Sequence, residues 1–211
     1  MRLTHIGLFA VSLALLAAPA RSALLNVDTG GNLLGAQDVN VAGVGLFDVA
    51  FAEDSCANLF PDCNDASDFH LANQTEVGAA AQALLDQVFI NDGPLRLFDD
   101  DPTLTFGCGA SSFGLGCNVM IPFGNLLPNG RIPIGSAVNR NQLQTDTIIN
   151  SGSIGPSFNS AASETHVFAI FTAASSSPTS SVPEPAGLLL VGAGLAALTA
   201  LRRRTAGPAR G

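Results

Sequence analysis

The sequence predicts an α+β fold, in which a small and largely antiparallel sheet carries one main helix at about residues 74–90. Two observations lead to this prediction. One segment repeats its apolar residues at helical spacing, and several short runs rich in β-branched and aromatic residues are separated by Gly, Pro and Asn. These segments lie between residues 24 and 174, which is a common length for one domain.

Residues 33–51 carry the pattern of a β-hairpin. Alternation in the second half of this stretch places Phe47, Val49 and Phe51 on one face of a strand. A glycine-containing turn, Gly43-Val44-Gly45, separates the two halves. The pattern therefore predicts two antiparallel neighbours in the sheet.

The main helix is predicted to begin after Asn73. An Asn at this position can cap the first backbone N–H groups, and Glu76 stands three residues later, in a capping-box arrangement. Apolar residues then recur at helical spacing as far as Val88, and the sequence Asn-Asp-Gly-Pro that begins at Asn91 ends the helix.

The remaining strands are predicted to be short. The last of them, Thr165–Phe171, is apolar enough to lie in the interior of the sheet. The other runs that could form strands are Leu104–Phe106, Val119–Phe123, Arg131–Val138 and Thr147–Ile149.

Charge is distributed unevenly along the 211 residues. Sixteen of the seventeen acidic residues and only three of the nine arginines lie in residues 22–174, which gives this region a formal net charge of −13. A nucleic-acid partner would require a basic face, so we expect none.

Four cysteines occur in two close pairs, Cys56 with Cys63 and Cys108 with Cys117. An even number of cysteines is typical of disulfides if the chain is exported, as its N-terminus indicates below, and local pairing is the simplest of the three possible connectivities. A four-cysteine zinc site is the alternative, but the tight spacing of such sites is missing. We therefore expect two disulfides and no metal.

Acidic residues and histidines offer weaker candidates for a site. Asp62, Asp65 and Asp68, and the run Asp99–Asp101, contain oxygen ligands suited to Ca²⁺, although neither matches an EF-hand loop. The candidates for hydrolytic chemistry are His70 and His166, but no G-x-S-x-G motif marks a serine nucleophile. We expect solvated loops, no catalytic residue and no cofactor.

The N-terminus has the three parts of a secretory signal peptide over residues 1–20. Arg2 provides the positive charge, and Ile6–Ala18 is a short apolar run. Ala18 and Ala20 flank Pro19 as small residues before the expected cleavage point. The run is shorter than the roughly 20 residues of a membrane span, which favours export with cleavage over a permanent anchor.

The C-terminus combines three further features. A Ser/Thr/Pro linker covers residues 175–182, and Pro183-Glu184-Pro185 follows it as a stiff, extended peptide. Residues 186–201 are apolar, with a helical length of roughly 24 Å, and are predicted to form a transmembrane helix. Arg202, Arg203 and Arg204 come directly afterwards and are placed to remain cytoplasmic.

Residues 182–204 resemble the PEP-CTERM sorting signal, which consists of Pro-Glu-Pro, an apolar helix and an Arg-rich end. The resemblance implies a Gram-negative bacterium and processing near Pro183, Glu184 and Pro185 by a membrane-embedded exosortase. It also implies an inner-membrane precursor, delivery to the cell surface or extracellular matrix, and an association with exopolysaccharide and biofilm.

These inferences predict an exported, non-enzymatic surface or matrix protein with a structural or binding role. Two alternatives from other classes remain open. One is a secreted hydrolase of matrix polysaccharide that uses two facing carboxyl groups. The other is a calcium-dependent adhesive module, whose thermal midpoint would rise with Ca²⁺.

Overall fold

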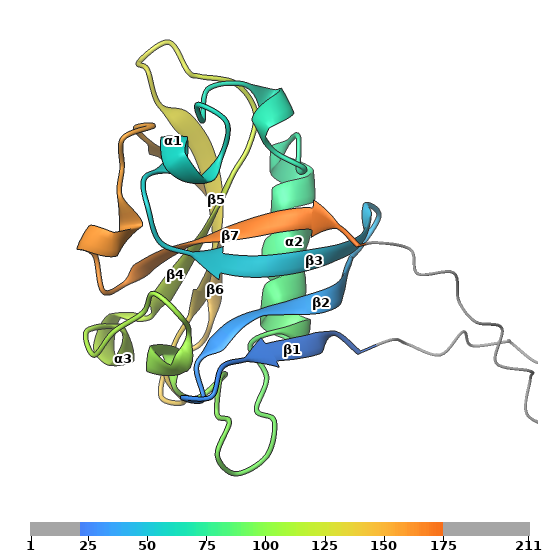
Figure 1. The fold of residues 1–211 in the computed structure, drawn as a ribbon, viewed down its shortest axis with the longest axis vertical. Helices are drawn as coiled ribbons and strands as arrows, with labels where there is room; N and C mark the ends of the chain where they lie inside the picture. Colours follow the sequence, from blue (N-terminus) through green and yellow to red (C-terminus); the bar gives the residue numbers. More distant parts are fainter. Residues whose placement is uncertain (1–21, 175–211) are drawn as a thin grey trace, which may run out of the picture. The chain divides into compact units, whose positions relative to one another are not determined.

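A computed structural model describes residues 22–174, which form a seven-stranded sheet with one long helix (Figure 1). The expected signal helix at 1–20, the linker and the sorting segment lie outside the described residues. The strands are β1 (Leu24–Val27), β2 (Leu33–Val41), β3 (Gly45–Ala52), β4 (Cys117–Pro122), β5 (Ile132–Asn139), β6 (Thr147–Ile154) and β7 (His166–Ala173).

The strand order in the sheet is β1-β2-β3-β7-β4-β5-β6. All neighbouring strands are antiparallel except β7 and β4, which are parallel. The prediction of a largely antiparallel α+β sheet is therefore confirmed. The last strand of the domain, β7, lies at the centre of the sheet and joins the β1-β2-β3 meander to the β4-β5-β6 meander.

Helix α2 (Gln74–Gln87) covers one face of the sheet and packs against β2, β5 and β6. In Figure 1 it crosses behind β3 and β7. Shorter helices lie in the loops: α1 (Cys56–Leu59), α3 (Ser112–Leu115), and 3₁₀-helices at Ala66–Asp68, Pro102–Leu104 and Ser160–Ala162.

Apolar side chains form a core on each face of the sheet. On the α2 side, Val77 and Leu84 of the helix pack with Val119 of the sheet, and all three are fully buried. On the other face, Phe60 and Phe168 belong to a second cluster beneath the loops that contain α1 and the segment before β7. Irregular segments thus cover the face that has no long helix.

The start of α2 agrees with the predicted cap. The Asn73 side chain accepts hydrogen bonds from the backbone N–H groups of Thr75 and Glu76, at 3.0 and 3.1 Å. The Glu76 carboxylate turns back to the N–H of Ala72 at 2.8 Å, one residue earlier than an ideal capping box requires.

The helix ends at Gln87, three residues before the predicted end at about residue 90. The backbone N–H groups of Val88 and Phe89 both donate to the carbonyl of Leu84, which closes the last turn. Phe89 is then buried and stacks on Phe51, with 5.7 Å between ring centroids. Burial of these two side chains therefore ends the helix before Asn91 is reached.

The strand predicted at Leu104–Phe106 is wrong. Pro102–Leu104 forms a 3₁₀-helix because the Asp101 side chain accepts a hydrogen bond from the N–H of Thr103 at 3.0 Å. Only Thr105 makes an isolated bridge, to Leu33. The other predicted strands exist, although β6 extends five residues beyond the predicted end at Ile149.

Within residues 22–174, none of the helices combines the length and the apolar character that crossing a membrane requires.

Candidate functional site

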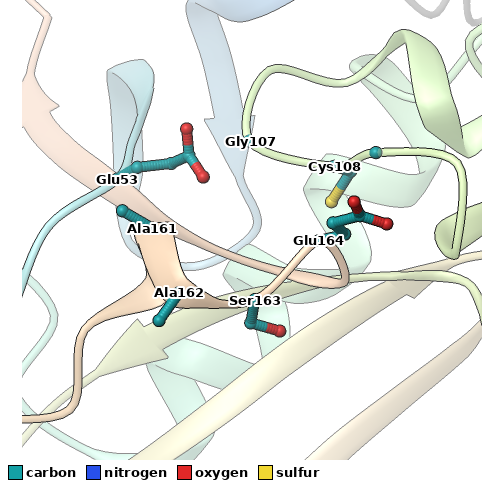
Figure 2. A pocket seen from close by; sticks show the side chains of 8 residues that line it. Glu53, Gly107, Cys108, Ala161, Ala162, Ser163 and Glu164 are labelled. Carbon is teal, nitrogen blue, oxygen red and sulfur yellow. The ribbon is translucent and has the colours of Figure 1, made fainter.

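A pocket of about 380 Å³ lies where the end of β3, the loop around Cys108 and the segment before β7 meet (Figure 2). Figure 2 shows the Glu53 and Glu164 carboxylates on different sides of this pocket, which we call the acidic pocket. Its lining residues are Glu53, Gly107, Cys108, Gly109, Ala161, Ala162, Ser163 and Glu164.

Two glycines allow the walls of the acidic pocket to approach closely. Gly107 has a φ angle of +82°, and a Cβ atom there would lie 2.8 Å from side-chain atoms of Glu53 and Val167. The N–H of Gly109 donates to the carbonyl oxygen of Glu164 at 2.8 Å. The backbone around Cys108 is therefore bound directly to the segment that leads into β7.

The side chain of Glu164 is held by Ser111, the residue before helix α3. Its carboxylate accepts hydrogen bonds from the Ser111 hydroxyl at 2.7 Å and from the Ser111 N–H at 3.4 Å. These bonds, the side-chain bond first, hold the pKa of Glu164 below its usual value. Glu164 is therefore a carboxylate at neutral pH and contributes negative charge to the pocket.

Glu53 faces the same pocket without a hydrogen bond to another described residue. Two carboxylates beside one cavity suit a cationic group, and they are also the residue types that glycoside hydrolysis uses. A general acid in that reaction must hold a proton near neutral pH. The lowered pKa of Glu164 does not suit the role of general acid. Of the two carboxyl groups, only that of Glu53 is then a candidate for this role.

His166 lies beside the acidic pocket at the start of β7. Its Nδ1 atom is 2.9 Å from the hydroxyl oxygens of both Ser163 and Thr165. Burial lowers the pKa of the imidazole, so the ring is neutral at pH 7 and packs edge-on against Phe158. Among residues 22–174, no side chain hydrogen-bonds to Nε2 to orient the ring for catalysis.

His70 lies elsewhere, exposed between Phe69 and Leu71 beside a small pocket under β7. Of the two candidate histidines, only His166 lies beside a serine hydroxyl among the described residues. That serine, Ser163, stands three residues earlier in the chain. The sequence pattern offered no reason to single out Ser163.

In the first acidic stretch, the carboxylates of Asp65 and Asp68 accept hydrogen bonds from nearby backbone N–H groups. Asp65 and Asp68 form a capping box around the 3₁₀-helix Ala66–Asp68, in which Asp68 accepts from the N–H of Asp65 at 3.0 Å. Asp62 is exposed. Within residues 22–174, no three His, Cys, Asp or Glu side chains are grouped closely enough to hold a metal ion.

The Asp99–Asp101 run divides between two roles. Asp101 caps the following 3₁₀-helix, whereas Asp99 and Asp100 line a polar pocket of about 250 Å³ together with Asp146. Burial raises the pKa of Asp99, and the neighbouring charge of Asp100 adds to this effect. Arg140 lines the same pocket and supplies a positive charge.

The predicted local disulfides are confirmed. Cys56 is bonded to Cys63 and Cys108 to Cys117, each with 5.7 Å between Cα atoms. The second disulfide joins the wall of the acidic pocket to the first residue of β4.

The sorting residues Pro183, Glu184, Pro185, Arg202, Arg203 and Arg204, and the cleavage residues Ala18 and Ala20, lie outside the described residues. The acidic pocket was not predicted, because Glu53 and Glu164 are 111 positions apart in the chain and neither stands in a motif. The pairing of β3 with β7, together with the hydrogen bond from the N–H of Ser160 to the carbonyl of Asp54, brings their segments together.

Comparison with known proteins finds a match in the C-terminal segment. No curated protein and no solved structure matches the chain. A family model for the PEP-CTERM protein-sorting motif matches residues 181–204, which include Pro183-Glu184-Pro185 and the three arginines. The motif implies export, a membrane-anchored precursor and processing by exosortase, a membrane enzyme. The chain is thus an exported protein that carries a C-terminal PEP-CTERM sorting signal.

Proposed function

We propose that the body is a non-enzymatic component of the bacterial cell surface or extracellular matrix, with a structural or binding role linked to exopolysaccharide. The sorting motif at residues 181–204 carries this proposal. Exosortase recognises the Pro-Glu-Pro peptide while the apolar segment holds the precursor in the inner membrane, and the body then leaves that membrane.

The chemistry of the body supports this destination. Both cysteine pairs are oxidised, which suits a compartment outside the reducing cytoplasm. Its net charge of −13 opposes binding to nucleic acid and to anionic lipid. Apolar side chains form a core on each face of the sheet, as in a folded domain.

Intact mass spectrometry of the protein from its host, fraction by fraction and without reduction, tests the proposal. We expect a mature chain that begins near Arg21, ends near Pro183–Pro185, has no free thiol and lies outside the inner membrane. A chain that keeps residues 186–204 and occurs only in the inner membrane would overturn processing and leave an anchored periplasmic protein.

The acidic pocket favours one second candidate, a hydrolase that acts on matrix polysaccharide. Its two carboxylates, from Glu53 and Glu164, are the observation behind this alternative. The purified chain should then release reducing ends from the host's exopolysaccharide, and Glu53→Gln should abolish the release. We expect no release from either protein, and release by the unmodified chain alone would replace the non-enzymatic proposal.

A further inference from the structure

A second hollow lies where the first turn of α2, the segment between β4 and β5, and the edge strand β6 meet, and we call it the β6 groove. It has a volume of about 510 Å³ and is open to solvent. Its lining residues are Gln74, Phe123, Leu127, Pro133, Asn150, Ser151, Gly152 and Ser153. The volume lies within the range of about 300–1,000 Å³ that is typical of small-molecule sites.

Backbone contacts hold the walls of the groove in place. The Gln74 side chain, in the first turn of α2, donates from Nε2 to the carbonyl of Asn150 at 2.7 Å. Phe123 donates its backbone N–H to the carbonyl of Pro133 at 3.1 Å. Helix, loop and edge strand are therefore tied together, so a ligand would not have to order them.

An irregularity in the sheet shapes the polar wall of the groove. The register between β5 and β6 shifts between Ile134 and Ser136, and Asn150 and Ser151 have no partner residue in β5. Such irregularities redirect side chains at the edges of sheets. Both residues are exposed, and their side chains make no hydrogen bond to another residue of the described range.

The lining combines an apolar part with uncharged polar groups. Phe123, Leu127 and Pro133 provide apolar surface, and Phe123 provides an aromatic ring. Amides from Gln74 and Asn150 and hydroxyls from two serines can both donate and accept hydrogen bonds. No lining residue carries a charge, although the body as a whole is strongly acidic.

We propose that the β6 groove binds an uncharged segment of a polysaccharide. A sugar ring has the complementary chemistry: its C–H face packs on an aromatic or apolar surface, and its hydroxyls exchange hydrogen bonds with amides and hydroxyls. The open shape admits a continuous chain as well as a chain end. This inference rests on the proposed matrix function, because a matrix surrounds the protein with such chains.

Arg131 places a positive charge beside the polar wall, where it contacts Ser153. Its Nε donates to the Ser153 hydroxyl at 3.0 Å, and its NH2 group donates to the Ser153 carbonyl. Both contacts direct the guanidinium to the protein's own strand. The lining itself is uncharged, and the body has a net charge of −13, which disfavours an anionic sugar relative to an uncharged one.

The test uses the full chain with its disulfides intact, in a zwitterionic detergent that has no sugar head group. Titration calorimetry measures binding of cellohexaose and maltohexaose, with hexagalacturonate as the anionic comparison.

Three variants test the residues of the groove. The double variant Asn150→Ala, Ser151→Ala removes the two exposed polar side chains. Phe123→Leu removes the aromatic ring but keeps apolar volume, since Phe123 also packs against the core. Gln142→Ala, an exposed amide in the pocket around Asp99, is the matched control.

We expect a neutral hexasaccharide to bind, with affinity about tenfold weaker in each groove variant and unchanged in Gln142→Ala. Three results overturn the assignment: no binding of either neutral sugar, binding that both groove variants retain, or a preference for hexagalacturonate. None of these results bears on the mature mass and location, which test the proposed function separately.

Discussion

At the residue scale, polar side chains stabilise this domain mainly by binding backbone groups. Asn73, Asp65, Asp101 and Asn159 each accept a hydrogen bond from an N–H group in the first turn of a helix. Within residues 22–174, the one salt bridge is between exposed residues, Arg96 and Asp92, at 3.1 Å, and such a pair adds little stability. Capping residues are therefore more sensitive polar positions than this exposed ion pair.

Asn73→Ala should lower the free energy of unfolding by about 1 kcal/mol, because it removes the acceptor for two N–H groups at the start of α2. Asn73→Ser keeps an acceptor for the cap without adding a carboxylate beside Glu76, which accepts a hydrogen bond from the Asn73 amide at 2.7 Å, and should cost much less. Far-UV circular dichroism during urea unfolding is a suitable measurement, since the chain has neither Trp nor Tyr. Equal stability of the Ala and Ser variants would contradict this account of the cap.

Asp146 should make stability depend on pH in an unusual direction. Burial raises its pKa, with a further contribution from the charge of Asp99, while the bond from the Arg140 N–H opposes the shift. A raised carboxyl pKa means that the folded state holds the proton more tightly than the unfolded state. Ionisation therefore destabilises the fold at neutral pH, and this cost disappears as the pH falls below the unfolded value of about 4.

Asp146→Asn should accordingly stabilise the protein at pH 7, by less than about 1 kcal/mol because the residue is partly exposed. The difference from the unmodified chain should vanish near pH 3. Urea unfolding at the two pH values measures it. A stabilisation of equal size at both values would mean that charge is not the cause.

At the scale of elements, local patterns predicted the β2–β3 hairpin and the start of α2, because a glycine turn and an N-cap act within a few residues. They failed where distant segments decide the structure. Phe89 leaves the helix to stack on Phe51, and Thr105 meets Leu33 only as an isolated bridge. The acidic pocket and the β6 groove belong to the same class, because each is assembled from segments that are far apart in the chain.

The two disulfides should contribute similarly to stability. Their cysteines are seven and nine residues apart, and loops of this size give about 2–3 kcal/mol each in the chain-entropy account. Replacing both Cys56 and Cys63 by Ala should therefore lower the free energy of unfolding by about this amount.

The matched double variant Cys108→Ala, Cys117→Ala should lose about as much stability, since the loops differ by only two residues. Urea unfolding of both variants provides the comparison. A loss several times larger in one of them would show that packing around that disulfide, and not loop closure, dominates its contribution.

At the scale of the whole molecule, the position of β7 connects folding to export. This strand is the last in the domain, yet it lies between β3 and β4 and pairs with both. Its side chains contribute to both cores, with Val167 on the α2 side and Phe168 on the other. The sheet is therefore complete only after residues 166–173 have been exported, and Pro183 follows Ala173 by ten residues.

Two truncations separate the role of β7 from that of the tail. A chain that stops after Ala174 keeps all seven strands, so we expect it to fold in the periplasm and to resist limited proteolysis. A chain that stops after Glu164 loses the central strand, which leaves β3 and β4 with unpaired edges and opens both cores, so proteases should degrade it. Digestion of both exported chains under the same conditions measures the difference. Resistance of the shorter chain would mean that the two meanders fold without β7, whereas sensitivity of the longer chain would mean that the body depends on residues after Ala174.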